Sequence, residues 1–165
     1  MESRQTPMFG QLRLATPGDV SAMVPLINAA FAVETFMEAP RTDADHLPEM
    51  MEKGEFLLGY DGSGELVASV YVERRGSRGY FGMLAVAVAH QGRGFARAMV
   101  EAVEDHCRTR GCTAMDLNVL SLRGDLLPFY ARLGYHETGV EPFPAAHLVK
   151  NEAACHCIVM SKELD

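Results

Sequence analysis

The stretch from Tyr80 to Arg110 constrains the fold of this chain more than any other. It reads YFGMLAVAVAHQGRGFARAMVEAVEDHCRTR, with an unbroken apolar run over 80–89 and a glycine turn over 91–94. A helical pattern follows at once, and its apolar face is made by Phe95, Met99, Ala102, Val103 and His106. This order predicts a buried strand that leads through a tight turn into an amphipathic helix.

The glycine turn predicts an anion-binding site. Gly92 and Gly94 have no Cβ, so backbone amides can approach a ligand closely. The first amides of the helix point outward, and the helix dipole places roughly half a positive charge there. Arg93 and Arg97 add formal charge beside it. A pyrophosphate group fits such a turn.

Length and charge narrow the function classes. The 165 residues predict one domain, 1–165, with residues 1–10 as a flexible N-terminus. A net charge of −7 argues against nucleic acid as the main partner, because phosphate backbones bind basic faces. We find neither an apolar run long enough to cross a membrane nor a signal-peptide pattern, so we expect a cytoplasmic location.

The four cysteines predict neither a disulfide framework nor a metal site. Cys155 and Cys157 lie two apart in a strand-like segment, where they share one face and pack as small apolar residues. The paired C-x2–4-C spacing of a structural zinc site is absent, so we expect no metal.

The rest of the chain alternates between strand and helix patterns. Thr16 and Pro17 predict a helix start, and the glycines and aspartate of 61–64 predict a hairpin turn. The expected strands are 11–15, 55–60, 65–74, 80–89, 113–120, 135–140 and 154–160, and the expected helices are 17–31, 43–53, 95–110 and 125–133. The order β-α-α-β-β-β-α-β-α-β-β predicts an α/β fold with one mixed sheet, in which three antiparallel strands precede the glycine turn.

Two other glycine-turn designs fit poorly. A Walker A loop requires Lys after its last glycine, and none follows Gly94. A dinucleotide fingerprint requires a third glycine where Arg97 stands, and it lies in parallel βαβ units.

The remaining design is Q-x-x-G-x-A, which Gln91, Gly94 and Ala96 satisfy. With it, the chain resembles the GCN5-related N-acetyltransferase (GNAT) family. Leu84-Ala85-Val86 and Leu117-Asn118-Val119 look like the two central strands of that family, and 127–135 (LPFYARLGY) looks like its closing helix. The resemblance covers about the second half of the chain.

The resemblance implies a mostly antiparallel sheet, flanked by helices, whose two central strands splay apart in a V. Acetyl-CoA would lie in the gap, with the backbone of Leu84, Ala85 and Val86 pairing with its pantetheine arm. The residues expected to hold its pyrophosphate are Gln91, Gly92, Arg93, Gly94, Phe95, Ala96 and Arg97. Arg123 stands where many relatives have a cofactor-contacting Asn, and it could contact a phosphate or an acidic substrate group.

The implied activity is direct transfer of an acetyl group from acetyl-CoA to an amine in a ternary complex. Tyr130 stands where the family has its general acid. A phenol keeps its proton at neutral pH, so it can supply that proton to the leaving sulfur. Asn118 matches a position that carries a carboxylate in some relatives. Its amide cannot accept a full proton, but it could orient a water or the substrate at the catalytic site. Asp116 and Glu73 are alternatives as the base, through water.

The acceptor is left open. The first helix pair and the irregular loop 141–144 are expected to shape its site. From their position, Phe31, Glu34 and Phe36 are expected to line it, with Glu34 pairing an ammonium group. A small amine and a protein amino group are both compatible with the sequence, as is a homodimer. The alternative function is a non-catalytic acyl-CoA-binding or sensing domain, which the missing carboxylate at Asn118 favours.

Overall fold

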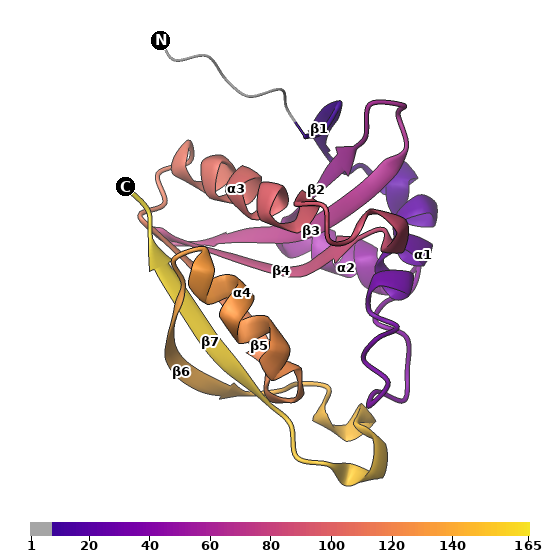
Figure 1. Cartoon of the computed structure of the whole chain (residues 1–165), viewed down its shortest axis with the longest axis vertical. Helices are drawn as coiled ribbons and strands as arrows, with labels where there is room; N and C mark the ends of the chain where they lie inside the picture. Colours follow the sequence, from indigo (N-terminus) through magenta and orange to yellow (C-terminus); the bar gives the residue numbers. More distant parts are fainter. Residues whose placement is uncertain (1–7) are drawn as a thin grey trace.

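The computed structural model describes residues 8–165, and its elements follow the predicted order (Figure 1). The strands are β1 (Gln11–Leu14), β2 (Glu55–Tyr60), β3 (Leu66–Arg75), β4 (Arg78–Val86), β5 (Ala114–Leu120), β6 (His136–Pro142) and β7 (His156–Glu163). The α-helices are α1 (Val20–Ala30), α2 (His46–Lys53), α3 (Phe95–Arg108) and α4 (Leu127–Arg132). None of the helices in this part of the chain is long and apolar enough to span a bilayer.

The N-terminus was predicted to be flexible over residues 1–10, and most of this stretch lies outside the described residues. Phe9 lies within the described residues. Its ring is buried and packs against Phe95 at a centroid distance of 5.3 Å. The amide of Gly10 also donates to the carbonyl of Tyr60, which fixes this segment beside β2.

One seven-stranded sheet runs through the molecule in the order β1-β2-β3-β4-β5-β7-β6. All neighbouring strands are antiparallel except β4 and β5, which are parallel. The predicted meander of β2, β3 and β4 is confirmed. A doubly wound dinucleotide-binding sheet requires parallel βαβ units instead, so that alternative is excluded.

The predicted V-shaped splay lies between β4 and β5. These strands pair only from Arg78 opposite Ala114 to Phe81 opposite Leu117 and then diverge. A β-bulge marks the start of the divergence, because Val70 on β3 faces two residues of β4, Met83 and Leu84. Met83 has φ +51°, a left-handed conformation that costs a non-glycine residue about 1–2 kcal/mol.

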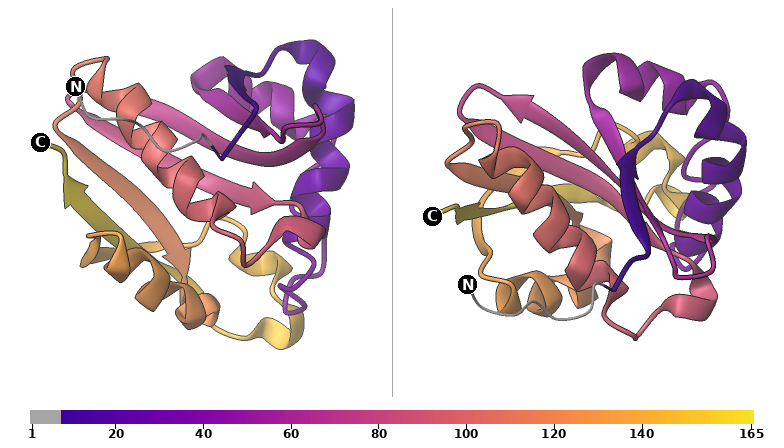
Figure 2. Two further views of the ribbon diagram at one scale, coloured as in Figure 1. Left: turned by 45° about the horizontal axis from the view of Figure 1, so that its top comes forward. Right: turned by 90° about the horizontal axis from the view of Figure 1, so that it is seen from above.

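Helices cover both faces of the sheet (Figure 2). Helix α3 packs on β3 and β4 from one face, and α1 packs on the same strands from the other. Two apolar cores result, one including Met99, Val103 and Tyr130 and the other including Met23, Ile27 and Leu47. On the predicted face of α3, Phe95, Met99 and Val103 are buried, whereas Ala102 and His106 are only partly buried.

Among the boundaries that differ from the prediction are those of β4, α1 and α2. The apolar run 80–89 was expected to be strand throughout, but β4 ends at Val86 and 88–90 forms a 3-10 turn. The segment 17–19 is also a 3-10 turn, capped by Thr16 as predicted, and α1 begins only at Val20. Helix α2 begins at His46, because the Asp43 carboxylate accepts from the amides of Asp45 and His46.

Candidate active site

The start of α3 presents unpaired main-chain amides. Gly92 and Gly94 have φ +77° and +92°, values that favour glycine and allow the chain to turn into the helix. Within residues 8–165, the amide of Ala98 donates to Gly94, whereas the amides of residues 92–97 donate no hydrogen bond. A fourteen-residue helix with free amides at its N-terminus attracts an anion.

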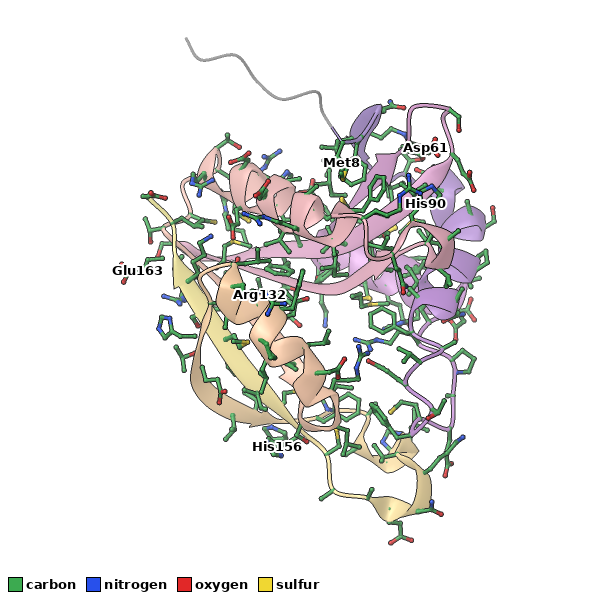
Figure 3. The ribbon with its side chains drawn as sticks, viewed as in Figure 1. Met8, Asp61, His90, Arg132, His156 and Glu163 are labelled. Carbon is green, nitrogen blue, oxygen red and sulfur yellow. The ribbon has the colours of Figure 1, made fainter. Side chains whose placement is uncertain are left out.

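His90 fixes this turn to the rest of the molecule, which the sequence interpretation did not anticipate. Figure 3 shows it beside Asp61 of the β2–β3 hairpin, with its Nε2 atom 3.7 Å from the Asp61 carboxylate. Its ring also packs edge-on against Phe95 at 5.5 Å. The Gln91 side chain adds a hydrogen bond of 3.1 Å to the carbonyl of Val86. Contacts with Asp61, Phe95 and Val86 thus hold the turn in place.

A cleft of about 550 Å³ begins beside this turn and runs into the splay between β4 and β5. Predicted site residues on its wall are Phe31, Glu34, Leu84, Val86, Gln91, Ala96, Asn118, Arg123 and Tyr130. The structure therefore brings together residues from both halves of the chain. A cleft of this size suits a ligand with a long, narrow arm.

The free edge of β4 fits the predicted backbone pairing at two of three residues. The amide of Ala87 donates to Val67 on β3, and alternate residues direct their main-chain groups to opposite edges. Val86 therefore directs its main-chain groups into the cleft, and so does Leu84, two residues earlier in the strand. Ala85 pairs with Ser69 and is buried, so the structure does not place it at the cleft and that prediction is corrected.

The predicted pyrophosphate residues divide into two groups. Gly92, Arg93, Gly94 and Arg97 are exposed at the turn, where their amides are accessible. The Phe95 side chain is instead buried in the core, so only its main chain can meet a ligand. The exposed Arg97 guanidinium lies 3.4 Å from Glu101, one turn along the helix.

Tyr130 lies on the wall of the cleft as predicted. Its ring packs against Phe81, Phe129 and Tyr135, and only 7% of the residue is exposed. Burial raises the pKa of its hydroxyl well above the usual value, against a smaller opposing effect of the Arg123 charge. The phenol thus keeps its proton at neutral pH.

Arg123 and Glu34 form part of the cleft wall through an ion-pair network. The Glu34 carboxylate accepts from Arg123 at 2.9 Å and from Arg41 at 3.1 Å, and Arg123 also pairs with Asp125. Two guanidinium groups already balance the Glu34 charge. The sequence suggested that Glu34 would pair an ammonium group. In the structure, its carboxylate is not free for that role.

A second cleft of about 560 Å³ lies on the α2 side of the sheet. It shares Arg41, Gly82, Met83, Asn118 and Leu120 with the first cleft, so the two meet where β4 and β5 diverge. A side chain at Gly82 would bring a Cβ within 3.0 Å of the Tyr80 hydroxyl, so glycine keeps this junction open.

The two carboxylates considered as bases have different surroundings. Asp116 lines neither cleft and accepts from Arg78 at 2.8 and 2.9 Å and from Ser161 at 2.6 Å. These bonds, Arg78 first, lower its pKa, and its position outside both clefts argues against Asp116 as the base. Glu73 does line the second cleft, but Tyr71 and Arg75 donate to it at 2.5 and 2.6 Å.

The sequence interpretation named neither Arg41 nor Met83 at the clefts, and it included Glu141 only as part of the loop expected to shape the acceptor site. Arg41 stacks on the Phe31 ring at 4.2 Å, a contact for which the sequence carries no periodic signal. Glu141 stands in a stretch that was expected to be an irregular loop, although β6 continues to Pro142.

The cysteines and histidines form no metal centre in the described range. Over residues 8–165, no three His, Cys, Asp or Glu side chains gather closely enough to hold a metal ion. All four cysteines are free thiols, and Cys107, Cys112 and Cys157 are buried.

Comparisons with known proteins agree with this geometry. Residues 24–149 match the family profile described as "Acetyltransferase (GNAT) domain". The chain is 30% identical over 122 residues to glucosamine 6-phosphate N-acetyltransferase 1 of Oryza sativa subsp. japonica, which covers 74% of this chain and 72% of that protein.

Solved structures share the fold at lower identity. The ribosomal-protein-S18-alanine N-acetyltransferase of Escherichia coli aligns with a TM-score of 0.74 at 16% identity, covering 94% of each chain. A Salmonella typhimurium acetyltransferase solved with its cofactor acetyl-CoA aligns with a TM-score of 0.70 at 20% identity, again over 94% of each chain.

Proposed function

Because the chain belongs to the GCN5-related N-acetyltransferase family and is an acyltransferase that uses acetyl-CoA, we propose that it transfers the acetyl group directly to an amine in a ternary complex. The observation that carries this proposal is the meeting of two clefts at the splay. One cleft begins at the free amides of α3 and the other lies on the α2 side, so donor and acceptor can be bound together.

The residues on the first cleft fit the acetyl donor, whose thioester supplies an activated acetyl group. The unpaired amides of 92–97 would hold its diphosphate, with Arg93 and Arg97 adding charge. The main chain of Leu84 and Val86 would bond its arm along the free edge of β4. Arg123 would shape the wall through its pair with Glu34 instead of binding phosphate itself.

Tyr130 would act as the general acid that returns a proton to the leaving sulfur. It lines the cleft, and burial keeps its hydroxyl protonated. Within the described part of the chain no side chain accepts from this hydroxyl, so the proton is not committed elsewhere. A phenol in these surroundings suits proton donation better than nucleophilic attack.

Direct transfer is favoured over an acetyl-cysteine intermediate. Cys157 is the cysteine on the wall of the second cleft, and burial is the main cause that raises the pKa of its thiol. A thiol that stays protonated is a weak nucleophile. Steady-state kinetics should therefore give intersecting, not parallel, lines when both substrates are varied.

The acceptor would be a primary amine, either small or on a protein. The rice relative is named for glucosamine 6-phosphate and the Escherichia coli neighbour for an alanine of ribosomal protein S18. Both present an amino group, and the second cleft, with charges of both signs, is large enough for either kind.

The test is release of CoA across an amine panel, with glucosamine 6-phosphate, an alanine-terminated peptide and spermidine as first members. Calorimetry of CoA runs beside it, using Gly94→Glu as the variant that places a negative charge at the free amides. We expect turnover with at least one class of amine and loss of CoA binding in the variant. Undiminished CoA binding by Gly94→Glu would contradict the diphosphate site.

A further inference from the structure

We propose that Glu141 is the general base that takes a proton from the acceptor ammonium, with Asn118 holding both groups in place. This inference rests on the proposed function, because it concerns the acceptor side of the same site. It assigns a role to a residue that lies outside every motif of the sequence, on the exposed strand β6.

Asn118 lies at the point where the two clefts meet, and it links that point to Glu141. Its Nδ2 atom donates to the Glu141 carboxylate at 3.4 Å. An amide can orient an ammonium through its carbonyl oxygen but cannot take a proton from it. The carboxylate beside it can, so the two side chains together supply what one acidic residue at position 118 would supply.

The strand register explains how Glu141 reaches across β7. Cys157 on β7 stands opposite both Leu120 on β5 and Glu141 on β6, so these three share one face of the sheet. Asn118 is two residues from Leu120 and therefore points to the same face. The small Cys157 side chain leaves room above it for the long Glu141 side chain.

Other carboxylates of the second cleft are less suited to this role. Glu73 accepts from Tyr71 and Arg75, so its oxygens already have close donors. Glu49 lines the cleft from α2, and within the described residues no hydrogen bond joins it to Asn118. Among the described residues, Glu141 accepts no side-chain hydrogen bond other than the long one from Asn118.

The remaining charged and titratable groups facing this cleft come from every element packed around it. They are Arg41 in the loop before α2, His46 and Lys53 at the two ends of α2, Arg75 on β3, Tyr80 on β4 and Cys157 on β7. Arg75 stacks on the Tyr80 ring at 4.1 Å and Arg41 pairs with Glu34, so both cations have other partners.

The proton balance of the reaction closes with these groups. The ammonium gives one proton to Glu141, and the neutral nitrogen forms a bond to the thioester carbonyl carbon. The carbon–sulfur bond then breaks, and the sulfur takes the proton of the Tyr130 hydroxyl. The nitrogen of the product still carries one proton more than an amide, and it gives this proton to Tyr130. Glu141 then releases its own proton to solvent.

The experiment compares two amine probes in the full chain with acetyl-CoA. n-Butylamine is an ammonium ion at neutral pH, with a pKa near 10 like that of a lysine side chain. Methoxyamine is already neutral and needs no base. The variant is Glu141→Gln, and the matched control is Glu137→Gln, which lies on the same exposed strand and lines neither cleft.

We expect Glu141→Gln to lower kcat/KM for n-butylamine about 100-fold at neutral pH, the lower range of general-base effects. The loss should shrink toward alkaline pH, where the free amine is present, and methoxyamine should react within a few-fold of wild type. Glu137→Gln should behave as wild type with both probes. Asn118→Asp combined with Glu141→Gln should recover part of the n-butylamine rate.

Three results would overturn the assignment. Equal losses for both probes at every pH would indicate a structural effect, and no loss would remove Glu141 from the reaction. A pH-dependent loss in Glu73→Gln alone would transfer the role to Glu73. Failure of the wild type to bind CoA, or to acetylate either probe, would instead contradict the proposed function, so the two failures are distinguishable.

Discussion

The ion-pair network of Glu34 gives the most direct test of how the cleft wall is built. Glu34 follows α1, and Arg123 precedes α4, 89 residues later in the chain. The Glu34 side chain is only 5% exposed and accepts from both Arg41 and Arg123. Glu34→Gln keeps the shape of the side chain and removes its charge, so two guanidinium groups lose their shared counter-ion.

The expected cost follows from distances and burial. At about 3 Å and an effective dielectric of about 20, each pair attracts by about 5 kcal/mol before other effects are counted. Desolvation of the carboxylate and repulsion between the two arginines remove much of that gain. Breaking buried pairs typically costs about 3–5 kcal/mol. Because Arg41 is 30% exposed and can regain water, we expect a loss of about 2–4 kcal/mol.

Urea denaturation measures this loss, with Glu38→Gln as the matched control. Glu38 lies in the same loop, is exposed and forms no ion pair within residues 8–165, so its change should stay within about 0.5 kcal/mol. Arg123→Met should cost less than Glu34→Gln, because Arg41 still balances Glu34. If Glu34→Gln unfolded at the same urea concentration as the Glu38 control, the reasoning on buried charge would be refuted.

Two further predictions concern the site, and a third concerns an ion pair beside β1. Tyr130→Phe should lower turnover about 100-fold or more and leave CoA affinity in calorimetry nearly unchanged; unaltered turnover would remove the acid role. Gly94→Ala meets only the Met8 side chain, at 3.6 Å, so the left-handed backbone alone should cost about 1–2 kcal/mol, divided between urea stability and CoA affinity. Gly62→Ala, with open space and no positive φ, is its neutral control, and equal behaviour of the two would contradict the argument. The Arg13 guanidinium holds the pKa of Asp19 far below its usual range, so the stability that Asp19 adds is present above about pH 4 and is lost as the pH falls. Urea midpoints of wild type and Asp19→Asn should therefore converge toward pH 2, and a constant gap would contradict this sign.

Local signals allowed much of the fold to be predicted. The hairpin turn at 61–64, the Thr16 cap and the glycine turn before α3 all depend on neighbours within a few residues. The amphipathic face of α3 is likewise a local pattern. Their order was enough to predict the antiparallel meander, the single α/β domain and the family.

The parts that failed depend on contacts between distant residues. Glu34 seemed free because nothing in the sequence shows that Arg123 approaches it. Ala85 was expected at the cleft because the resemblance assigns three consecutive residues to the cofactor arm, whereas main-chain alternation directs the groups of Ala85 toward β3. The contact between Glu141 and Asn118 was not foreseen, because it crosses an intervening strand.

The short ladder between β4 and β5 has a consequence for rigidity. Beyond Phe81 and Leu117, β4 and β5 form no further ladder pairs within the described residues, so the sheet divides there into two parts, β1 to β4 and β5 to β7 (Figure 1). A ligand bound along the free edge of β4 adds main-chain hydrogen bonds there, so ligand binding also makes the sheet more rigid. At a hundredfold excess over its Kd, such a ligand adds about 2.7 kcal/mol to the free energy of unfolding. Amide hydrogens near the junction should then exchange with solvent far more slowly.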